Sequence, residues 1–346
     1  MSSLSSILLI AMGSLCAASF YVPINKIKQW SWESYWVIQG VASWIIAPWI
    51  FAYFTVPNLM QVLSSSPSSA IINTMIFGAL WGVGGLTFGL SMRFLGVAMG
   101  QSISLGFCAA FGTLAAPIIS GSNLFSSHEG IMILSGVSIC IAGIAVVGYA
   151  GAIRSKNLSQ KERANAIKDF ALKKGLLIAI FAGVMSACFS IGLTGISGVM
   201  DAGNKINDTA KIYGTDPLFA SNPVYIIVML GGFLTNFVYC MYLNYSNRTF
   251  SDYFSLPAST LINNLFFCFL GGTLWYLQFF FFGMGQSKLP FGMAAFGWSI
   301  LMALNILFSN IWGIILSEWR GSGKRSVSTL VLGLFLLILS TFVIKL

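Results

Sequence analysis

Apolar residues fill this chain in long runs without a charged side chain, and polar residues gather between the runs. The charge-free runs cover residues 1–25, 34–92, 94–127, 130–153, 175–200, 217–247, 253–287, 289–317 and 326–344. A helix that crosses a membrane needs about 20 consecutive apolar residues. The run 34–92 is too long for one crossing, and it contains the turn formers Pro57, Asn58 and Pro67. Dividing it there predicts ten transmembrane helices.

The composition supports a membrane protein. Of the 346 residues, 57% are hydrophobic and 8% are charged, whereas soluble domains carry about a quarter charged residues. Backbone polar groups in lipid must be paired within the protein, so spans of this hydrophobicity are helices. We therefore expect an all-α polytopic membrane protein. The first run lacks a basic segment before it, so we interpret it as a spanning helix and not as a cleaved signal peptide.

The basic residues fall mainly on one side of the predicted helices. Loops after the odd-numbered helices hold 14 Lys and Arg, and the other side holds four. Because Lys and Arg favour the cytoplasmic side, this bias predicts cytoplasmic odd loops and both termini outside. Seven of the 18 basic residues lie between Arg154 and Lys174 without interleaved aromatic residues. The net charge of +9 therefore does not indicate nucleic-acid binding.

Two apolar segments are similar to each other. The segments 78–99 and 272–293 agree at seven of 22 positions when they are aligned at an offset of 194, and Trp81 then matches Trp275. A weaker pair joins Gly13 to Gly183 at an offset of 170. Five predicted helices separate the copies, and an odd number of crossings reverses the direction of the second copy.

This spacing predicts two inverted five-helix repeats. The first covers 1–152, the second covers 175–346, and a polar basic connector at 153–174 joins them. Inverted repeats around a site near the middle of the bilayer are typical of secondary transporters, in which the two halves exchange conformations. The sequence therefore favours a transporter with alternating access.

The chain offers little material for catalysis. It has one His, nine Asp and Glu, and six cysteines that sit singly in apolar runs. No nucleophile–base pair, metal-binding spacing, C-x-x-C motif or phosphate-binding loop is present in the sequence. We therefore predict no enzyme activity, no metal site and no cofactor.

Several motifs carry a resemblance to a known family. They are SFYVPINKIKQWSWESYW (19–36), GALWGVGGLTFGLSMRFLG (78–96), FALKKGL (170–176), GGTLWYLQFFFFGMG (271–285) and SEWRGSGKR (317–325). They resemble the L-rhamnose–proton symporter family of the drug/metabolite transporter superfamily, essentially end to end. The resemblance implies a ten-helix fold in a bacterial inner membrane that imports a deoxy-hexose with protons. It also implies an Asp and a His on the helix after Pro290, but residues 291–310 contain no titratable group here.

Polar and aromatic side chains inside the predicted spans are the candidate binding residues, because such groups are costly in a bilayer. Sugar hydroxyls need amides and hydroxyls, and sugar C–H faces need flat aromatic surfaces. Trp275 and Gln278 share one helix face, as do Gln101 and Ser104. The predicted substrate-binding residues are Tyr21, Lys26, Trp81, Gln101, Ser104, Asn264, Trp275, Gln278, Trp298 and Ser299. Tryptophans near predicted helix ends, including Trp44 and Trp49, are interpreted as membrane-interface residues.

The coupling cation is left open by the sequence. No Asp or Glu lies in the middle of a predicted span, so the candidates for cation coupling are the edge residues Glu33, His128 and Glu129. A proton could be carried by these groups, and sodium could be bound by hydroxyls and backbone carbonyls. A sodium-coupled sugar transporter, or an exporter or exchanger of another metabolite on the same fold, is the alternative function. The oligomeric state is not indicated.

Overall fold

Long apolar helices make up the protein. The computed structural model describes residues 3–95, 97–121, 124–157, 172–289, 297–315, 319 and 322–343, and these contain no β-strand. Within this part of the chain, eight helical segments are long and apolar enough to cross a membrane: Leu4–Ile24, Trp32–Thr55, Ser68–Ser91, Gly130–Arg154, Lys173–Thr194, Pro217–Asn247, Ala258–Ser287 and Gly297–Ile315. The chain is therefore an all-helical, multi-pass membrane protein.

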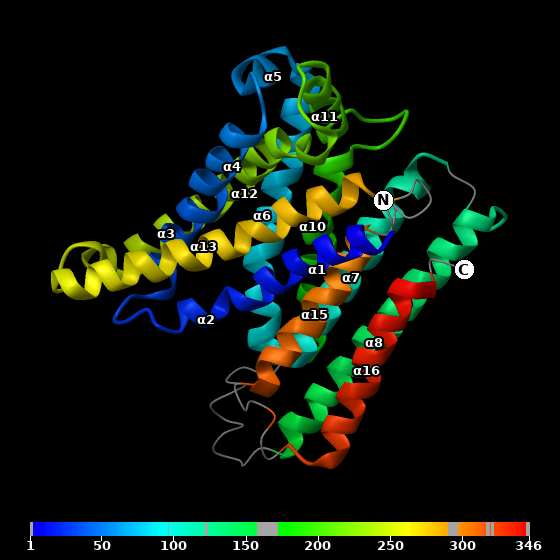
Figure 1. The fold of residues 1–346 in the computed structure, drawn as a ribbon. Helices are drawn as coiled ribbons and strands as arrows, with labels where there is room; N and C mark the ends of the chain where they lie inside the picture. Colours follow the sequence, from blue (N-terminus) through cyan, green and yellow to red (C-terminus); the bar gives the residue numbers. More distant parts are fainter. Residues whose placement is uncertain are drawn as a thin grey trace. The chain divides into compact units, whose positions relative to one another are not determined.

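Figure 1 shows the order of the described helices along the chain. In the first part they are α1 (Ser3–Ser19), α2 (Tyr21–Ile24), α3 (Trp32–Gly40), the π-helix η1 (Val41–Ile46), α4 (Ala47–Thr55), α5 (Leu59–Ser65), α6 (Ser68–Leu95), α7 (Val97–Ile119) and α8 (His128–Asn157). In the second part they are α10 (Leu172–Thr194), α11 (Gly203–Ile212), η2 (Pro217–Phe219), α12 (Asn222–Asn247), η3 (Phe250–Tyr253), α13 (Ala258–Ser287), α15 (Gly297–Ile315) and α16 (Lys324–Val343).

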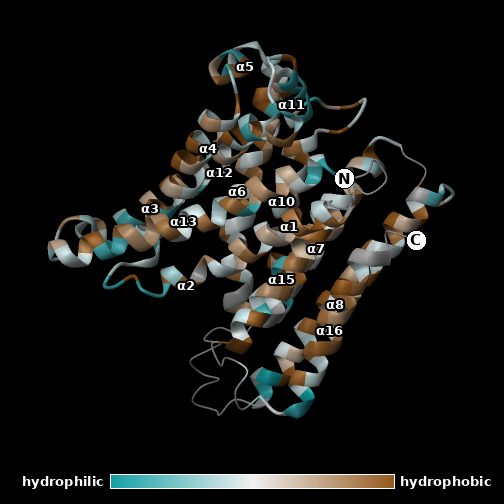
Figure 2. Ribbon diagram, viewed as in Figure 1, coloured by the Kyte–Doolittle hydropathy of each residue, from teal (hydrophilic) through white to brown (hydrophobic). Residues whose placement is uncertain are grey.

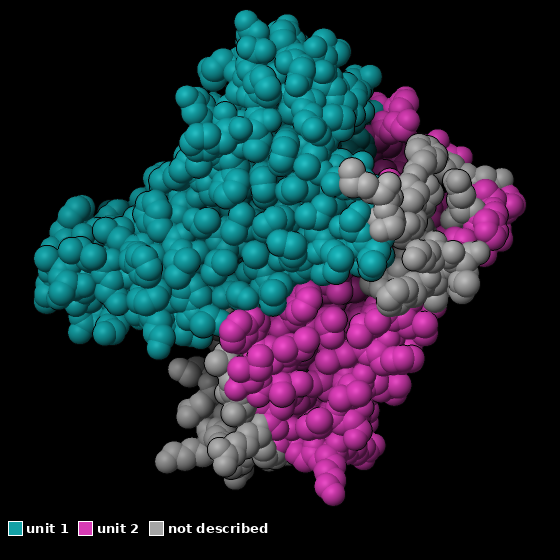
Figure 3. Space-filling model, in the orientation of Figure 1, with its two compact units in different colours: residues 1–82, 192–195, 200–288 teal, residues 83–191, 196–199, 289–346 magenta. Residues whose placement is uncertain are grey.

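The described helices form two compact units (Figure 3). Unit 1 contains residues 1–82, 192–195 and 200–288, and unit 2 contains residues 83–191, 196–199 and 289–346. Each unit therefore draws on both sequence halves, and α6 contributes its first part to unit 1 and its second part to unit 2. These compact units are not the same segments as the two predicted repeats. The repeats are predicted from internal similarity, and a division by contacts does not test that similarity, so they stay a prediction.

In unit 1, α1 packs along α13, and α3 packs against α12 and α13. One side of α1 turns apolar side chains outward, with Leu4 and Leu8 more than half exposed, while Ile10 and Ala17 are buried on the other side. Figure 2 shows hydrophobic residues along the long helices and hydrophilic residues mainly near their ends. Exposed apolar faces of this extent are costly in water but fit the hydrocarbon of a bilayer.

The predicted break in the run 34–92 is confirmed, because α4 ends at Thr55 and α6 begins at Ser68. Between the charge-free runs 175–200 and 217–247, the chain does not form a plain loop. Half of residues 201–220 form α11, which packs against α5 and α12. Ile206 is fully buried, and Ala210 joins an apolar cluster with Val62. This helix is amphipathic, and its polar face carries charged residues, so the sequence shows no long apolar run here.

In unit 2, α8 lies along α16, and the two helices run antiparallel (Figure 1). Small residues bring them close together. A Cβ atom on Gly143 would come 3.0 Å from the side chain of Leu337, and one on Gly333 would come 2.7 Å from Val147. Small residues let helices approach in lipid, where no hydrophobic drive holds them together.

Candidate functional site

Two of the predicted residues, Trp81 and Trp275, meet in unit 1. Their rings stack with centroids 5.6 Å apart and planes inclined by 26°. Trp44 from the π-helix η1 stands edge-on to both rings, at 5.8 Å from Trp81 and 5.7 Å from Trp275. Trp36 contacts Trp44 at 5.9 Å, and Phe279 contacts Trp275 at 5.0 Å. Sequence positions almost 200 residues apart therefore build one aromatic cluster, which we call the tryptophan cluster (Trp36, Trp44, Trp81, Trp275 and Phe279).

Glycines and one buried amide shape this cluster. A Cβ atom on Gly232 would overlap the six-membered ring of Trp81, and one on Gly40 would lie 3.0 Å from the ring of Trp44. Asn236 accepts a hydrogen bond of 3.0 Å from Trp36 Nε1 and donates to the carbonyl of Gly232 at 2.9 Å. The backbone at Gly232 thus leaves no room for a side chain beside Trp81, Gly40 allows a close contact with Trp44, and Asn236 uses both its oxygen and its nitrogen.

Trp44 corrects the interpretation as an interface residue. Only 6% of its surface is exposed, whereas Trp49, one turn further along, is 40% exposed. The sequence placed both near a helix end, but the helix formed by α3, η1 and α4 continues through Trp44 without a break. Trp44 therefore sits inside the helix packing, and Trp49 keeps the exposed position expected of an interface residue.

Gln278 lies on α13 one turn from Trp275, as predicted, and it is 5% exposed. The helix α1 crosses at this point, because a Cβ atom on Gly13 would come 2.6 Å from the carbonyl oxygen of Gln278. An amide and an indole thus occur close together on one helix of unit 1, and the amide is buried. This is the combination that can pair with a hydroxyl and cover a C–H face.

Three further predicted residues belong to unit 2. The hydroxyl of Ser299 lies 2.7 Å from that of Thr113, and Trp298 stacks on Phe189 at 5.8 Å. Ser104 lies 3.2 Å from the hydroxyl of a neighbouring serine, Ser91. All six side chains in these contacts are buried within unit 2.

Asn264 and Lys26 lie at the connection between α2 and α3. The Asn264 amide accepts from the backbone N–H of Lys28 at 3.0 Å and donates to its carbonyl at 2.8 Å. The carbonyl of Lys26 accepts from Asn263 Nδ2 at 3.0 Å, and the Lys26 residue is exposed. These bonds tie the connection to the start of α13, so both sides of the Asn264 amide serve the loop.

Two carboxylates anchor the beginning of α3. Glu33 is buried and accepts hydrogen bonds from Asn247 Nδ2 at 2.9 Å and Thr249 Oγ1 at 3.0 Å. Asp252 was not among the predicted candidates. It accepts from the Ser31 backbone N–H at 2.8 Å and from the Ser31 and Ser34 hydroxyls at 2.7 and 2.8 Å.

The environment of Asp252 changes its acidity. Burial raises the pKa of this carboxyl, but hydrogen bonds from Ser31 and Ser34 to the charged form outweigh burial and hold the pKa below its usual value.

His128, another coupling candidate, is the exposed first residue of α8. The side chains of Tyr21, Gln101 and Glu129 lie outside the part of the chain that the structure describes.

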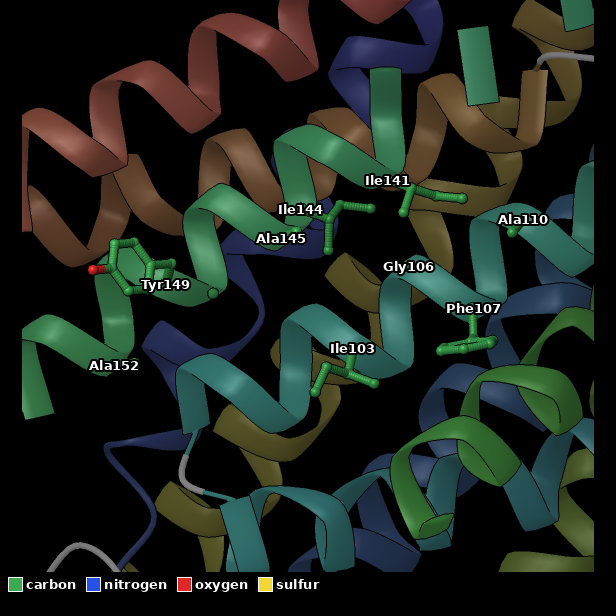
Figure 4. Close-up of a pocket in the computed structure, with 10 residues that line it drawn as sticks. Ile103, Gly106, Phe107, Ala110, Ile141, Ile144, Ala145, Tyr149 and Ala152 are labelled. Carbon is green, nitrogen blue, oxygen red and sulfur yellow. The ribbon is translucent and has the colours of Figure 1, made fainter. Parts of the chain in front are cut away.

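A groove of about 350 Å³ lies between α7 and α8 in unit 2 (Figure 4). Ile103, Phe107 and Ile144 line it together with small residues, and Tyr149 supplies a hydroxyl at one end. Because its walls are otherwise hydrocarbon, the groove lacks the polar groups that a sugar requires. The described residues also contain no cluster of three His, Cys, Asp or Glu side chains that could bind a metal.

Comparison with known proteins identifies the family. Residues 2–346 match the family model described as L-rhamnose-proton symport protein. The L-rhamnose-proton symporter of Klebsiella pneumoniae (strain 342) is 36% identical over 97% of this chain and 95% of its own length. Proteins of the same name from Citrobacter koseri and Escherichia coli (strain K12 / DH10B) are 36% and 35% identical over 96% of this chain and 94% of theirs. The chain therefore belongs to the family of L-rhamnose-proton symport proteins, which are transporters and not enzymes.

Proposed function

We propose that this protein imports L-rhamnose, or a closely related sugar, across a bacterial inner membrane together with a proton. The observation that carries the proposal is the 36% identity, over almost the whole chain, to proteins named L-rhamnose-proton symporters. The tryptophan cluster supports it, because stacked indoles offer flat apolar faces beside buried polar side chains. L-Rhamnose is a 6-deoxy sugar, and its methyl group and C–H face suit such a surface.

We propose Trp81, Trp275 and Gln278 as part of the sugar site. The remaining predicted residues, Tyr21, Lys26, Gln101, Ser104, Asn264, Trp298 and Ser299, stay candidates. Among them, Asn264 is the weakest, since its amide already pairs with the backbone of Lys28.

We also propose that the fold is an inverted repeat, and equivalent helix contacts support this. Gly78 and Gly272 match at the repeat offset of 194. A Cβ atom on Gly78 would overlap the backbone of α12 at Val228, and one on Gly272 would lie 2.7 Å from the backbone of α3 at Gln39. In a five-plus-five arrangement, the α6–α12 and α13–α3 crossings are the same crossing in the two repeats.

A second pair of contacts agrees with the first. Position 84 matches position 278 at the same offset. Gly84 packs on α10, where a Cβ atom would lie 2.5 Å from the Ser186 backbone N, and the Gln278 backbone packs on Gly13 of α1. The helices α1 and α10 are the first helices of the two proposed repeats.

The contact between α8 and α16 is reciprocal. Gly143 faces Leu337, and Val147 faces Gly333. Two equivalent helices related by a two-fold axis meet in this way, with each patch contacting its own copy. The ten-helix count then needs α7, whose apolar part is Ile103–Ile119, and α16 as spans beside the eight long apolar segments.

The basic residues support a topology with both termini in the periplasm. Arg154 and Lys156 end α8, and Lys173 and Lys174 begin α10. These ends flank the proposed connector, which the preference of Lys and Arg places in the cytoplasm.

One proton per sugar provides sufficient energy. Moving one positive charge inward is worth about 2.3 kcal/mol per 100 mV of membrane potential, and this corresponds to roughly fifty-fold accumulation. Glu33 is the described carboxylate best placed to contribute, because it is buried on α3, the helix that also carries Trp36. His128 and Glu129 stay candidates at the beginning of α8.

Uptake of radiolabelled L-rhamnose into right-side-out vesicles tests the proposal. We expect uptake above that of vesicles without the protein, stimulated by an inward proton gradient and abolished by a protonophore. Stimulation by a sodium gradient alone would replace the proton by sodium. No uptake under either gradient would reject L-rhamnose import.

A further inference from the structure

Helix α3 and the π-helix η1 carry buried polar atoms that the fold does not use. Gln39 and Ser43 are 3% and 1% exposed. Gln39 Oε1, Ser43 Oγ and Trp44 Nε1 have no hydrogen-bond partner among the described residues. Most buried polar groups are paired, since an unpaired one destabilises the fold. Three unpaired atoms within six consecutive residues therefore need an explanation.

The helix has an unusual shape at the same place. The π-helix η1 covers Val41–Ile46, and Pro48 follows it in the first turn of α4. Proline has no N–H and its ring clashes with the carbonyl four residues earlier, which here belongs to Trp44. The wider turn avoids this clash, and Pro48 itself has no N–H to donate to that carbonyl. Short π-helical turns are found frequently at functional sites.

These atoms lie next to the proposed sugar site. Trp44 follows Ser43 directly, and its ring contacts both Trp81 and Trp275 at less than 6 Å. Gln39 and Ser43 are one helical turn apart, so they share a face. Helix α13, which carries Trp275, passes against the same turn, because a Cβ atom on Gly272 would lie 3.1 Å from Ser43 N.

Two other buried amides of unit 1, those of Asn236 and Asn264, use both their oxygen and their nitrogen in hydrogen bonds within the protein. Asn236 uses its oxygen for Trp36 Nε1 and its nitrogen for the carbonyls of Gly232 and Gly82. Asn264 uses both ends of its amide for the backbone of Lys28. Gln39 is as deeply buried as these residues, but its oxygen is left for another partner.

The chemistry of the three groups selects a polyol over a cation. A bound cation needs oxygen acceptors only, and the indole N–H of Trp44 is a donor. A sugar hydroxyl both donates and accepts, so it can pair with the Gln39 oxygen, with the Ser43 hydroxyl and with the indole N–H. The neighbouring indole faces can cover the C–H side of the sugar ring.

We propose that Gln39, Ser43 and the indole N–H of Trp44 bind hydroxyl groups of the transported sugar. This inference rests on the proposed function and adds residues of α3 and η1 to its site. These three atoms are then unpaired among the described residues because their hydrogen-bond partners are the hydroxyl groups of the bound sugar.

Binding of L-rhamnose to purified Gln39→Met and Ser43→Ala proteins tests the inference. Each change removes one hydrogen bond, so we expect the Kd for L-rhamnose to rise about three- to ten-fold. Because Gln39 Oε1 and Ser43 Oγ have no hydrogen-bond partner among the described residues, the unfolding temperature without sugar should stay the same or rise. Two control variants are matched to them: Asn236→Leu should lower the unfolding temperature, and Ser66→Ala, which loses a bond to the Val62 carbonyl far from the site, should leave the Kd unchanged.

Deoxy analogues separate direct contact from indirect effects. The wild type should bind at least one monodeoxy L-rhamnose more weakly than L-rhamnose, and Ser43→Ala or Gln39→Met should lose that preference. Unchanged Kd values in both variants would overturn the inference. A higher Kd would also overturn it if the unfolding temperature falls and the preference for L-rhamnose over the deoxy analogue is unchanged. If the wild type fails to bind L-rhamnose, both the proposed function and this inference are rejected. If the wild type binds L-rhamnose and both variants bind it equally well, only this inference is rejected.

Discussion

Replacing Trp44 by alanine is the sharpest test of the packing in unit 1. The Trp44 ring makes edge contacts with Trp36, Trp81, Trp275 and Phe233 at centroid distances between 5.7 and 6.5 Å. Aromatic pairs of this kind contribute about 0.5–1.5 kcal/mol each. Their sum is an upper limit, because contacts that share one ring are not additive.

The bilayer changes the energy of this substitution. An unfolded helix stays in hydrocarbon, so transferring the indole into the protein interior adds little, and only packing is lost. We therefore expect Trp44→Ala to lower the free energy of unfolding by about 2–4 kcal/mol, below the largest costs seen for Trp→Ala in soluble cores.

Trp49 provides a matched control on the same helical segment. It is 40% exposed, and Trp49→Ala should cost less than about 1 kcal/mol. Reversible unfolding of both variants in mixed micelles, followed by tryptophan fluorescence and circular dichroism, measures the difference. Equal stability of the two variants would refute the placement of Trp44 inside the packing and would restore its interpretation as an interface residue.

Other substitutions test separate parts of the account. Gly78→Val and Gly272→Val should each prevent tight helix crossing and reduce the yield of folded protein to a similar degree, whereas Gly85→Ala, with open space around its Cα, should fold normally in a fluorescence size-exclusion assay. Asp252→Asn should lose stability relative to wild type above pH about 4, and acid should remove this difference as wild-type Asp252 becomes protonated through its lowered pKa; a difference constant with pH in thermal melts would contradict this. Glu33→Gln keeps an oxygen that accepts from Asn247 and Thr249 but removes the charge that strengthens both hydrogen bonds, so thermal stability should fall as in Asp252→Asn, and uptake should lose its pH dependence; an unchanged pH profile would remove Glu33 as a coupling residue.

The sequence predicts the membrane class and most helix boundaries. Long charge-free runs have one stable solution in lipid, and Pro57 and Pro67 mark the break between α4 and α6. The internal similarity also paired Trp81 with Trp275, and these rings are in contact. An offset between repeated segments marks equivalent positions but does not predict that they touch, so the contact itself comes from the structure.

The sequence does not show which helix faces meet. Trp44 and Trp49 are both aromatic residues in one apolar run, and only the packing distinguishes the buried ring from the exposed one. Gln39 and Ser43 were not selected because a single amide or hydroxyl in a span usually bonds a neighbouring helix. The signal that could have found them is Pro48, since a proline inside a span indicates a local change of helix geometry. Asp252 was missed because acidic residues in loops are usually solvated.

We place a sugar-binding surface of unit 1 on the stacked rings of Trp81 and Trp275. Equilibrium binding of L-rhamnose to purified Trp275→Ala and Gln278→Ala proteins, beside Trp49→Ala and wild type, tests it most directly. We predict saturable binding of L-rhamnose to wild type and to Trp49→Ala. Trp275→Ala should bind at least ten-fold more weakly, a loss of about 1.4 kcal/mol or more in binding free energy, and Gln278→Ala should also bind more weakly. Both variants should be expressed at a level comparable to wild type. Wild-type affinity in both Trp275→Ala and Gln278→Ala would contradict the claim and would place the sugar site elsewhere.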